Sequence, residues 1–123
     1  MINMEKREEI GVYQKVVIIN SESLGKGDDG VGQTLLGVFL RKILASLTKP
    51  DIIIFYNSGV KLLAQGSRYM DILEALEMQG VELLACGTCV YKVCGQHSLT
   101  VGRITDMNEI ADIVLNTNTV ITL

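Results

Sequence analysis

The chain has 123 residues and a net charge of −3, with 48% apolar and 20% charged residues, which is the size of one domain with its own core. A mildly acidic chain gives no reason to expect nucleic acid or an anionic membrane as a partner, so functions that depend on a basic patch are excluded. The mean hydropathy is +0.32, but no apolar run approaches the ~20 residues that span a bilayer. The surplus apolar surface therefore predicts contacts between subunits.

Residues 1–14 have charges of both signs and no apolar period, which predicts a tail or linker remnant in front of a domain covering residues 15–123. The segment lacks the apolar stretch of a signal peptide, so we expect a cytoplasmic protein. Three cysteines, two of them in a Cys-x-x-Cys pair, cannot all pair within one chain. We interpret them as reduced thiols that react or bind a ligand.

Short runs of apolar and β-branched residues predict the strands. They lie at residues 15–20, 51–56, 81–85, 99–101 and 119–122. The first two runs show no alternation of polar and apolar residues, which is typical of strands buried on both faces of a parallel sheet.

Amphipathic segments between these runs predict the helices. The first helix carries an apolar stripe wide enough to cover more than one surface. Asp28 or Asp29, Ser67 and Asp106 are the expected N-terminal caps, and Gly80 is an expected C-terminal stop. Three helices are expected, from Asp28–Asp29 to Leu44, from Ser67 to Gly80 and from Asp106 to Val114. A short helical turn is expected from Val60 to Gln65, and a helix or turn from Cys86 to Cys94.

Strands that alternate with helices at this spacing predict the α/β class, as a three-layer α/β/α Rossmann-like domain with a mainly parallel five-stranded sheet. In open α/β sheets, the loops at the carboxyl ends of the strands line the site. We therefore expect four loops to share one rim, at residues 21–27, 57–59, 86–89 and 102–103.

The most informative stretch runs an apolar strand, Val81 to Ala85, straight into the dithiol Cys86-Gly87-Thr88-Cys89, where a helix should begin. A thiol in the first turn of a helix faces unpaired backbone N–H groups, which favour the thiolate. Cys86 directly follows the strand, so we expect it to be the most reactive cysteine. Thiolates attack sulfur, selenium and metals, which makes this pair the candidate reactive site.

The loop before the first helix, Gly25-Lys26-Gly27-Asp28-Asp29-Gly30, matches the G-x-G-x-x-G pattern of dinucleotide-binding loops. However, five residues separate it from its strand, two carboxylates would lie where a pyrophosphate belongs, and the second strand ends without an acidic ribose ligand. We interpret the loop as a capped turn that borders the site, and we expect no cofactor.

Two alternative interpretations use the cysteines differently. A thioredoxin-like redox pair fits the Cys-x-x-Cys spacing, but the motif follows the third strand here, and Pro50, the only proline, precedes it. A zinc site is permitted by the spacing of four ligands, Cys86, Cys89, Cys94 and His97. The favoured interpretation of Cys94 is a small apolar filler, and that of His97 is a solvent-facing residue. A redox protein and a zinc-binding or partner-binding module therefore stay open.

Four segments carry a family resemblance: residues 21–29, 55–61, 84–89 and 101–105. Through them the sequence resembles the DsrE/DsrF-like sulfur-relay family, and within it the YedF-like branch of sulfurtransferase-like proteins of selenium metabolism. The resemblance implies a Rossmann-like domain, a homo-oligomer that is a trimer or higher, and a cysteine that carries sulfur as a persulfide. By position in the motif that cysteine is Cys86, and Cys89 is the second thiol of the branch.

The resulting hypothesis is a sulfur or selenium carrier, or a sulfurtransferase, in which Cys86 acts with Cys89. YedF-like proteins usually carry an N-terminal TusA-like domain with a Cys-Pro motif, which this chain does not show. The expected partners are therefore sulfur-donor and sulfur-acceptor proteins, a separate TusA-like protein among them. The expected substrate-binding residues on the rim are Gly25, Gly27, Asn57, Ser58, Gly59 and Arg103.

Overall fold

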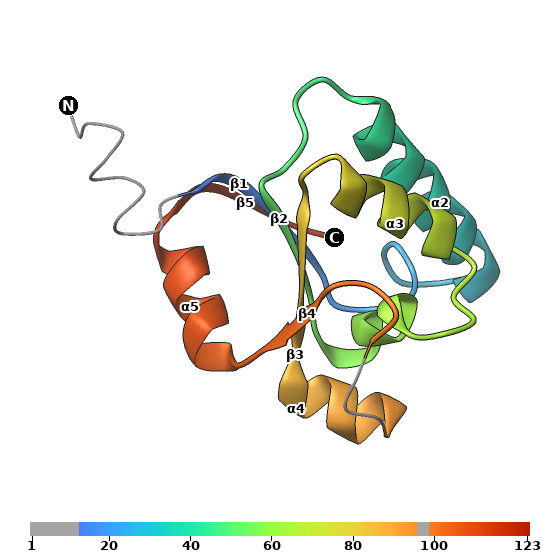
Figure 1. The fold of residues 1–123 in the computed structure, drawn as a ribbon. Helices are drawn as coiled ribbons and strands as arrows, with labels where there is room; N and C mark the ends of the chain where they lie inside the picture. The colour runs from blue at the N-terminus through green and yellow to red at the C-terminus, as the bar shows by residue number, and fades with distance from the viewer. Residues whose placement is uncertain (1–12, 96–98) are drawn as a thin grey trace.

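A parallel sheet forms the centre of the molecule. The computed structural model describes residues 13–95 and 99–123, and within them five strands form one sheet with the order β4-β3-β2-β1-β5 (Figure 1). Every pair of neighbouring strands is parallel. The strands are β1 (Tyr13–Ile19), β2 (Ile52–Phe55), β3 (Glu82–Cys86), β4 (Arg103–Thr105) and β5 (Thr117–Thr122).

Helices cover both faces of the sheet. Figure 1 shows α2 (Asp29–Ala45) and α3 (Met70–Met78) on one face and α5 (Met107–Leu115) on the other. The chain crosses the sheet in one direction from β1 to β4 and then returns to β5 beyond β1. Because parallel crossovers are right-handed, the return connection places α5 on the opposite face. The predicted three-layer α/β/α class is confirmed.

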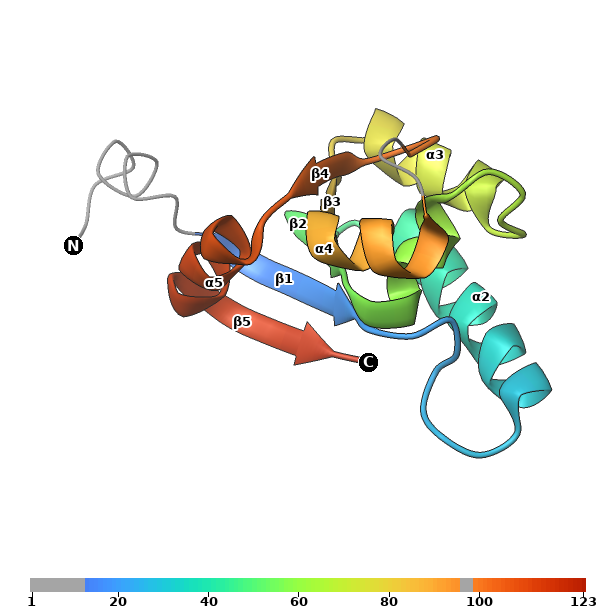
Figure 2. The same ribbon diagram turned by 90° about the horizontal axis from the view of Figure 1, so that it is seen from below.

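Two short helical segments lie at the carboxyl ends of the central strands. A 3-10 helix, η1 (Asn57–Leu63), follows β2, and α4 (Gly87–Cys89) follows β3 and continues as one π-helical stretch, η2 (Val90–Cys94). Figure 2 shows these segments side by side. Within the described parts of the chain, no helix combines the length and apolar character needed to cross a membrane.

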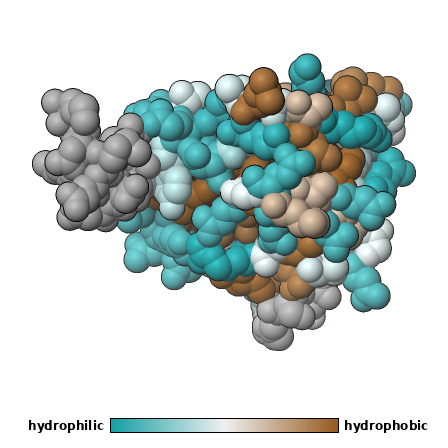
Figure 3. Space-filling view, turned by 45° about the horizontal axis from the view of Figure 1, so that its top comes forward, coloured by the Kyte–Doolittle hydropathy of each residue, from teal (hydrophilic) through white to brown (hydrophobic). Residues whose placement is uncertain are grey.

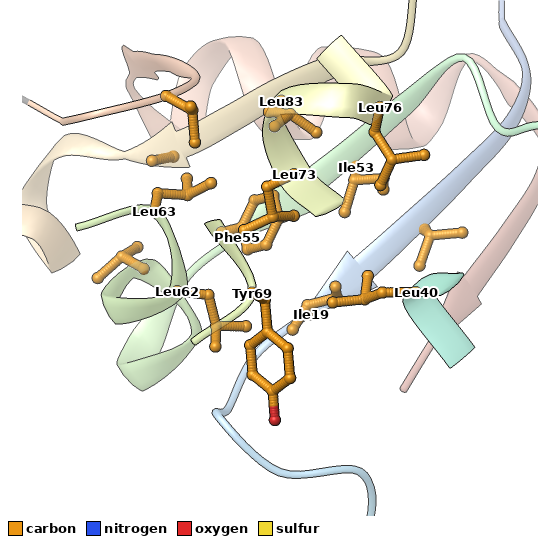
Figure 4. Close-up of a cluster of buried hydrophobic side chains, with 14 of the residues drawn as sticks. Ile19, Leu40, Ile53, Phe55, Leu62, Leu63, Tyr69, Leu73, Leu76 and Leu83 are labelled. Atoms are coloured by element: carbon orange, nitrogen blue, oxygen red, sulfur yellow. The ribbon is translucent and has the colours of Figure 1, made fainter. Parts of the chain in front are cut away.

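Strand β2 is buried on both faces, as its uninterrupted apolar run predicts. Ile53 and Phe55 belong to the larger core cluster with side chains of α2 and α3, as Figure 4 shows. Ile52 and Ile54 belong to the smaller cluster, which includes side chains of α5. Successive residues of a strand point to opposite faces, so a strand with a core on each side needs no polar alternation.

The apolar stripe of α2 is divided between the core and the surface. Leu36, Leu40 and Ile43 are buried, whereas Val31 is 56% exposed and Val38 is 55% exposed. Figure 3 shows apolar surface interspersed with polar side chains on the side of the molecule that carries α2 and α3. The stripe therefore covers the sheet and also leaves apolar side chains at the surface.

The fourth strand lies later than the sequence predicts. It was expected at residues 99–101, but β4 covers Arg103–Thr105 and pairs with β3 through Leu84↔Arg103 and Cys86↔Thr105. The backbone N–H of Thr100 donates instead to the Leu63 carbonyl at 3.1 Å. Gly102 then turns the chain with a φ of +84° before β4 begins. The β-branched pattern is similar in both segments, so it does not show which of them pairs.

The predicted helix ends are mostly confirmed. Asp28 and Asp106 cap α2 and α5, accepting hydrogen bonds at 2.9 Å from the N–H groups three residues further on. Gly80 follows α3 with a φ of +95°. Ser67 is not the cap of α3, because the helix begins at Met70 without a side-chain cap. The Ser67 hydroxyl instead accepts the Tyr69 N–H within the preceding turn.

Candidate dithiol site

Cys86 is the last residue of β3 and lies on the face of the sheet that α5 covers. Cys86 is 5% exposed and packs in the same apolar cluster as Ile110 and Ile113. Cys86 also occupies the N-cap position of α4, but its side chain makes no capping hydrogen bond. The Cys86 sulfur is expected beside the first free N–H groups of the next helix, but it makes no capping hydrogen bond to them. The strand period directs this side chain toward the α5 face.

Gly87 allows α4 to start close to β4. A Cβ atom at this position would lie 3.0 Å from Ile104 Cγ2 and 3.3 Å from the Thr105 carbonyl oxygen. A larger residue would require these neighbours to shift by a few tenths of an ångström. The glycine between the cysteines thus suits the close approach of this position to β4.

Cys89 lies one turn beyond Cys86 and is the more accessible of the two thiols. Its side chain is half-buried and contacts both core clusters. The sulfur accepts a hydrogen bond from the backbone N–H of Asn57 at 3.1 Å, and the two cysteines pack at the same apolar cluster, where Cys86 influences the pKa of Cys89. The structure therefore brings the two predicted catalytic thiols together.

The pKa of the Cys89 thiol is raised above its ordinary value. Burial is the main cause, because it disfavours the charged thiolate. The Asn57 N–H acts in the opposite direction and lowers the pKa. Cys86 raises it again, through the hydrogen bond between the two thiols and through the repulsion that a charge on Cys86 exerts on a second charge. The pair therefore favours one negative charge over two.

Asn57 reaches Cys89 because the loop after β2 is held tightly. The Tyr56 N–H donates to the Ile19 carbonyl at 3.2 Å, and the Gly59 N–H donates to the Tyr56 carbonyl at 3.1 Å. A Cβ atom on Gly59 would lie 2.4 Å from the Ile19 carbonyl oxygen, so only glycine fits there. Between these contacts Asn57 adopts a left-handed backbone with a φ of +52°, a conformation that asparagine tolerates better than most residues.

A pocket of about 690 Å³ lies beside this loop, at the carboxyl ends of β1 and β2. It brings together four predicted substrate-binding residues, namely Gly25, Gly27, Asn57 and Ser58. Gly59 is buried below the pocket surface, which agrees with its close approach to β1. Asn57 is the residue that connects the pocket to the dithiol, because it lines the pocket and its N–H binds Cys89.

Arg103 does not lie on this rim, which corrects the expectation for residues 102–103. Arg103 begins β4, so the carboxyl end of this strand is at Thr105 instead. Its guanidinium binds the carboxylates of Glu82 and Glu109, each at 2.9 Å. These contacts lower the pKa of Glu109 to about 2, with the Arg103 hydrogen bonds as the main cause.

Cys94 belongs to a different cavity, one of about 510 Å³ that Lys61 and Glu22 also line. Burial raises the pKa of Cys94, and the nearby Lys61 partly offsets this effect. Among residues 13–95 and 99–123, no three His, Cys, Asp or Glu side chains gather as a metal site. The zinc alternative therefore lacks Cys94 beside the dithiol, and its fourth proposed ligand, His97, lies outside the described residues.

Sequence reasoning missed the contact between Asn57 and Cys89 and the place of Gln33 and Leu123 in the pocket. Ser21, Ser23 and Lys26 lie in the loop 21–27 that was expected on the rim, but they were not named as substrate-binding residues. The serines form a local turn in which the Ser23 N–H donates to the Ser21 hydroxyl. A Ser-x-Ser sequence between a strand and a glycine is a recognisable signal for such a turn. No comparable signal links Asn57 to a thiol that lies 32 positions further along the chain.

Comparisons with known proteins place the fold. No family model matches the chain, and no curated protein matches it. The crystal structure of the ychN protein from E. coli aligns with a TM-score of 0.62 and 22% identity, covering 89% of this chain and 99% of ychN. The structure of MTH1491, a protein of unknown function from Methanobacterium thermoautotrophicum, aligns with a TM-score of 0.57 and 23% identity, over 80% and 88% of the two chains. At these identities the likeness shows the fold alone, which is the α/β fold with a parallel sheet described above.

Proposed function

We propose that this chain is a sulfur or selenium carrier of the DsrE/DsrF-like sulfur-relay type, with YedF-like proteins as its nearest branch, and that Cys86 holds the transferred atom. The observation that carries the proposal is the pair of thiols at the end of β3, of which Cys89 accepts a hydrogen bond from the Asn57 amide and has its pKa raised by burial and by Cys86. Asn57 also lines the neighbouring pocket, which has room for a donor or acceptor group but is not itself lined by either cysteine.

Uptake of sulfur needs one nucleophile and no cofactor. The Cys86 thiolate attacks the outer sulfur of a donor persulfide, R–S–SH, so that a Cys86 S–S bond forms and the donor leaves as the thiolate RS⁻. Cys89 stays beside Cys86 as a neutral thiol during uptake, because burial and the neighbouring Cys86 thiol raise its pKa. At 5% exposure, a persulfide on Cys86 is shielded from thiols in bulk solvent, as a carrier requires.

Release follows in one of two ways. An acceptor nucleophile takes the outer sulfur directly and leaves Cys86 as the thiolate. Alternatively, Cys89 attacks the inner sulfur, and a Cys86–Cys89 disulfide forms as hydrosulfide leaves. In the second route the outer sulfur is reduced and the two cysteine sulfurs are oxidised, so a thiol reductant must then restore the dithiol.

The other parts of the proposal concern the surroundings of the protein. A cytoplasmic location fits three cysteines that are all free in the structure. Homo-oligomerisation, as a trimer or higher, fits the apolar side chains that α2 exposes. Sulfur-donor and sulfur-acceptor proteins, including a TusA-like protein, are the proposed partners.

A dithiol redox protein is a second candidate function, and the packing of both thiols at one cluster favours it. Thiols in such contact can form a disulfide without a large rearrangement. The two functions differ in one product, because a redox protein gains no sulfur atom when it reacts.

The test is mass spectrometry of the intact protein after incubation with a sulfane-sulfur donor. We expect a gain of one sulfur atom in the parent and in Cys94→Ser, whose thiol lies in the other cavity, and no gain in Cys86→Ser. Cys89→Ser should still gain the sulfur but should not release it as hydrosulfide. A persulfide mapped to Cys94, or equal labelling of all three cysteines, contradicts the proposal.

A further inference from the structure

We infer that Asn57 is a positioning residue of the dithiol: its left-handed backbone directs the main-chain N–H onto the Cys89 sulfur and holds this thiol ready to attack Cys86. The inference rests on the proposed function, because it gives Asn57 a part in the release of sulfur. It assigns that part to the backbone and not to the side chain, which separates it from substrate binding in the pocket.

The geometry gives the N–H a single direction. Tyr56 is bound to β1 through the Ile19 carbonyl, and Gly59 is pressed against the same carbonyl. The residues between them have little freedom, and Asn57 accommodates the turn with a φ of +52°. It is the only non-glycine residue with a positive φ among the described residues. Such backbone outliers persist only where the surrounding contacts impose them, and they concentrate at functional sites.

The hydrogen bond from Asn57 stabilises the thiolate of Cys89, which is the form that attacks, more than the neutral thiol. An N–H that donates to sulfur stabilises the thiolate more than the thiol, because hydrogen bonds to a charged acceptor are stronger. At Cys89 this contact opposes the burial that otherwise keeps the proton on the sulfur. The other thiol that acts on the Cys89 sulfur is Cys86, which packs at the same apolar cluster.

The step that Asn57 assists needs only the Cys89 thiolate and the persulfide on Cys86. The Cys89 thiolate attacks the Cys86 sulfur of the persulfide, the Cys86–Cys89 bond forms, and the bond to the outer sulfur breaks. The outer sulfur keeps its own hydrogen and leaves as hydrosulfide, HS⁻, while the proton that Cys89 lost remains in solvent. As Cys89 loses its proton, the Asn57 N–H bears part of the new negative charge.

The test compares Asn57→Val with Asn57→Gly. Glycine adopts a positive φ readily, whereas a β-branched residue does so rarely, so only the valine variant should move the N–H away from Cys89. We expect alkylation of Cys89 near neutral pH to slow on the order of tenfold in Asn57→Val, with the midpoint of its pH profile shifted upward. In Asn57→Gly both should stay close to those of the parent.

Cys94 serves as an internal reference, since its thiol lies in the other cavity. Tandem mass spectrometry separates the three cysteines in one sample, and Cys94 should be alkylated at the parent rate in both variants. If Asn57→Val does not fold by circular dichroism, Asn57→Ala replaces it, because alanine also disfavours a positive φ. Equal Cys89 profiles in the glycine variant and the valine or alanine variant overturn the inference.

A second measurement separates this inference from the proposed function. Protein preloaded with sulfur should release hydrosulfide more slowly in Asn57→Val than in Asn57→Gly, while sulfur uptake at Cys86 is similar in both. If the parent forms no persulfide, the proposed function is wrong, but the alkylation comparison still reports whether Asn57 controls Cys89. If uptake occurs and the two variants release at the same rate, the positioning role is wrong and the carrier function stands.

Discussion

The central strands β2 and β3 differ from the edge strands β4 and β5 in their burial. All of β2 is buried, and so is β3 after its first residue. In contrast, β5 is exposed from its second residue onward, and β4 is exposed at its first two. Asn57 and the dithiol stand at the ends of the buried strands. Close packing on two faces fixes a strand in place, so the packing of β2 and β3 fixes the positions of the residues at their ends.

The comparison is tested most directly by the same substitution in both regions. Ile54 in β2 is 0% exposed and Ile121 in β5 is 38% exposed. We expect Ile54→Ala to lower the free energy of unfolding by about 2–5 kcal/mol, because it leaves a cavity between packed layers. Ile121→Ala should cost about 1 kcal/mol or less. Urea denaturation measures both, and similar losses would show that the edge is as tightly packed as the centre.

A second substitution sharpens the link between central packing and the site. Gly59→Ala places a Cβ atom against the Ile19 carbonyl oxygen, at 2.4 Å before relaxation, and should cost about 1–3 kcal/mol. It should also change the rate of Cys89 alkylation, because the loop that carries Asn57 must move.

Gly25→Ala is the matched control for this effect. Gly25 has a φ of +75° and no atom within 4 Å of a built Cβ, so its substitution costs only the left-handed backbone, about 1 kcal/mol. Thermal unfolding gives the two stabilities. The interpretation fails if Gly59→Ala leaves Cys89 alkylation at the rate of Gly25→Ala.

The smallest effect is expected at the β4 edge, where charges replace packing. Arg103 holds the pKa of Glu109 at about 2, below its ordinary 4.5. Since the folded protein favours the ionised carboxylate, the stabilisation is complete above about pH 4.5 and is lost as the pH falls toward 2. The side chains are 41–48% exposed, so solvent screening limits the effect to about 1 kcal/mol or less.

Glu109→Gln should remove this pH dependence. The difference in unfolding free energy between the parent and Glu109→Gln should shrink as the pH is lowered from about 4.5 to 2, and it should also shrink at high salt. A difference that grows on acidification would contradict the assignment of the low pKa to the Arg103 contact.

The contrast between centre and edge also explains what the sequence could predict. The runs that became β2 and β3 are buried by neighbours on both faces, so their composition alone predicts them. The Asp28 cap is equally local, because donor and acceptor are three residues apart. The α/β class follows from these elements.

The failures share a different cause. The choice between residues 99–101 and 103–105 for β4 depends on which segment pairs with β3, and Arg103 was placed on the wrong side of its strand as a result. The Asn57 contact with Cys89 joins the ends of two neighbouring strands. Interactions of this kind depend on register and backbone direction, which residue type alone does not determine.

The pairing of β1 with β5 has a consequence for biosynthesis. Tyr13 pairs with Thr117 and Ile18 with Thr122, so β1 cannot complete its pairing on this side before β5 has been synthesised. A ribosome delivers the chain from its N-terminus, and until residues 117–122 emerge, β1 exposes a full row of unpaired backbone groups along one side. An open strand edge invites pairing with other chains. Until β5 has emerged, the nascent chain therefore carries an open edge on β1 at which it can pair with other chains.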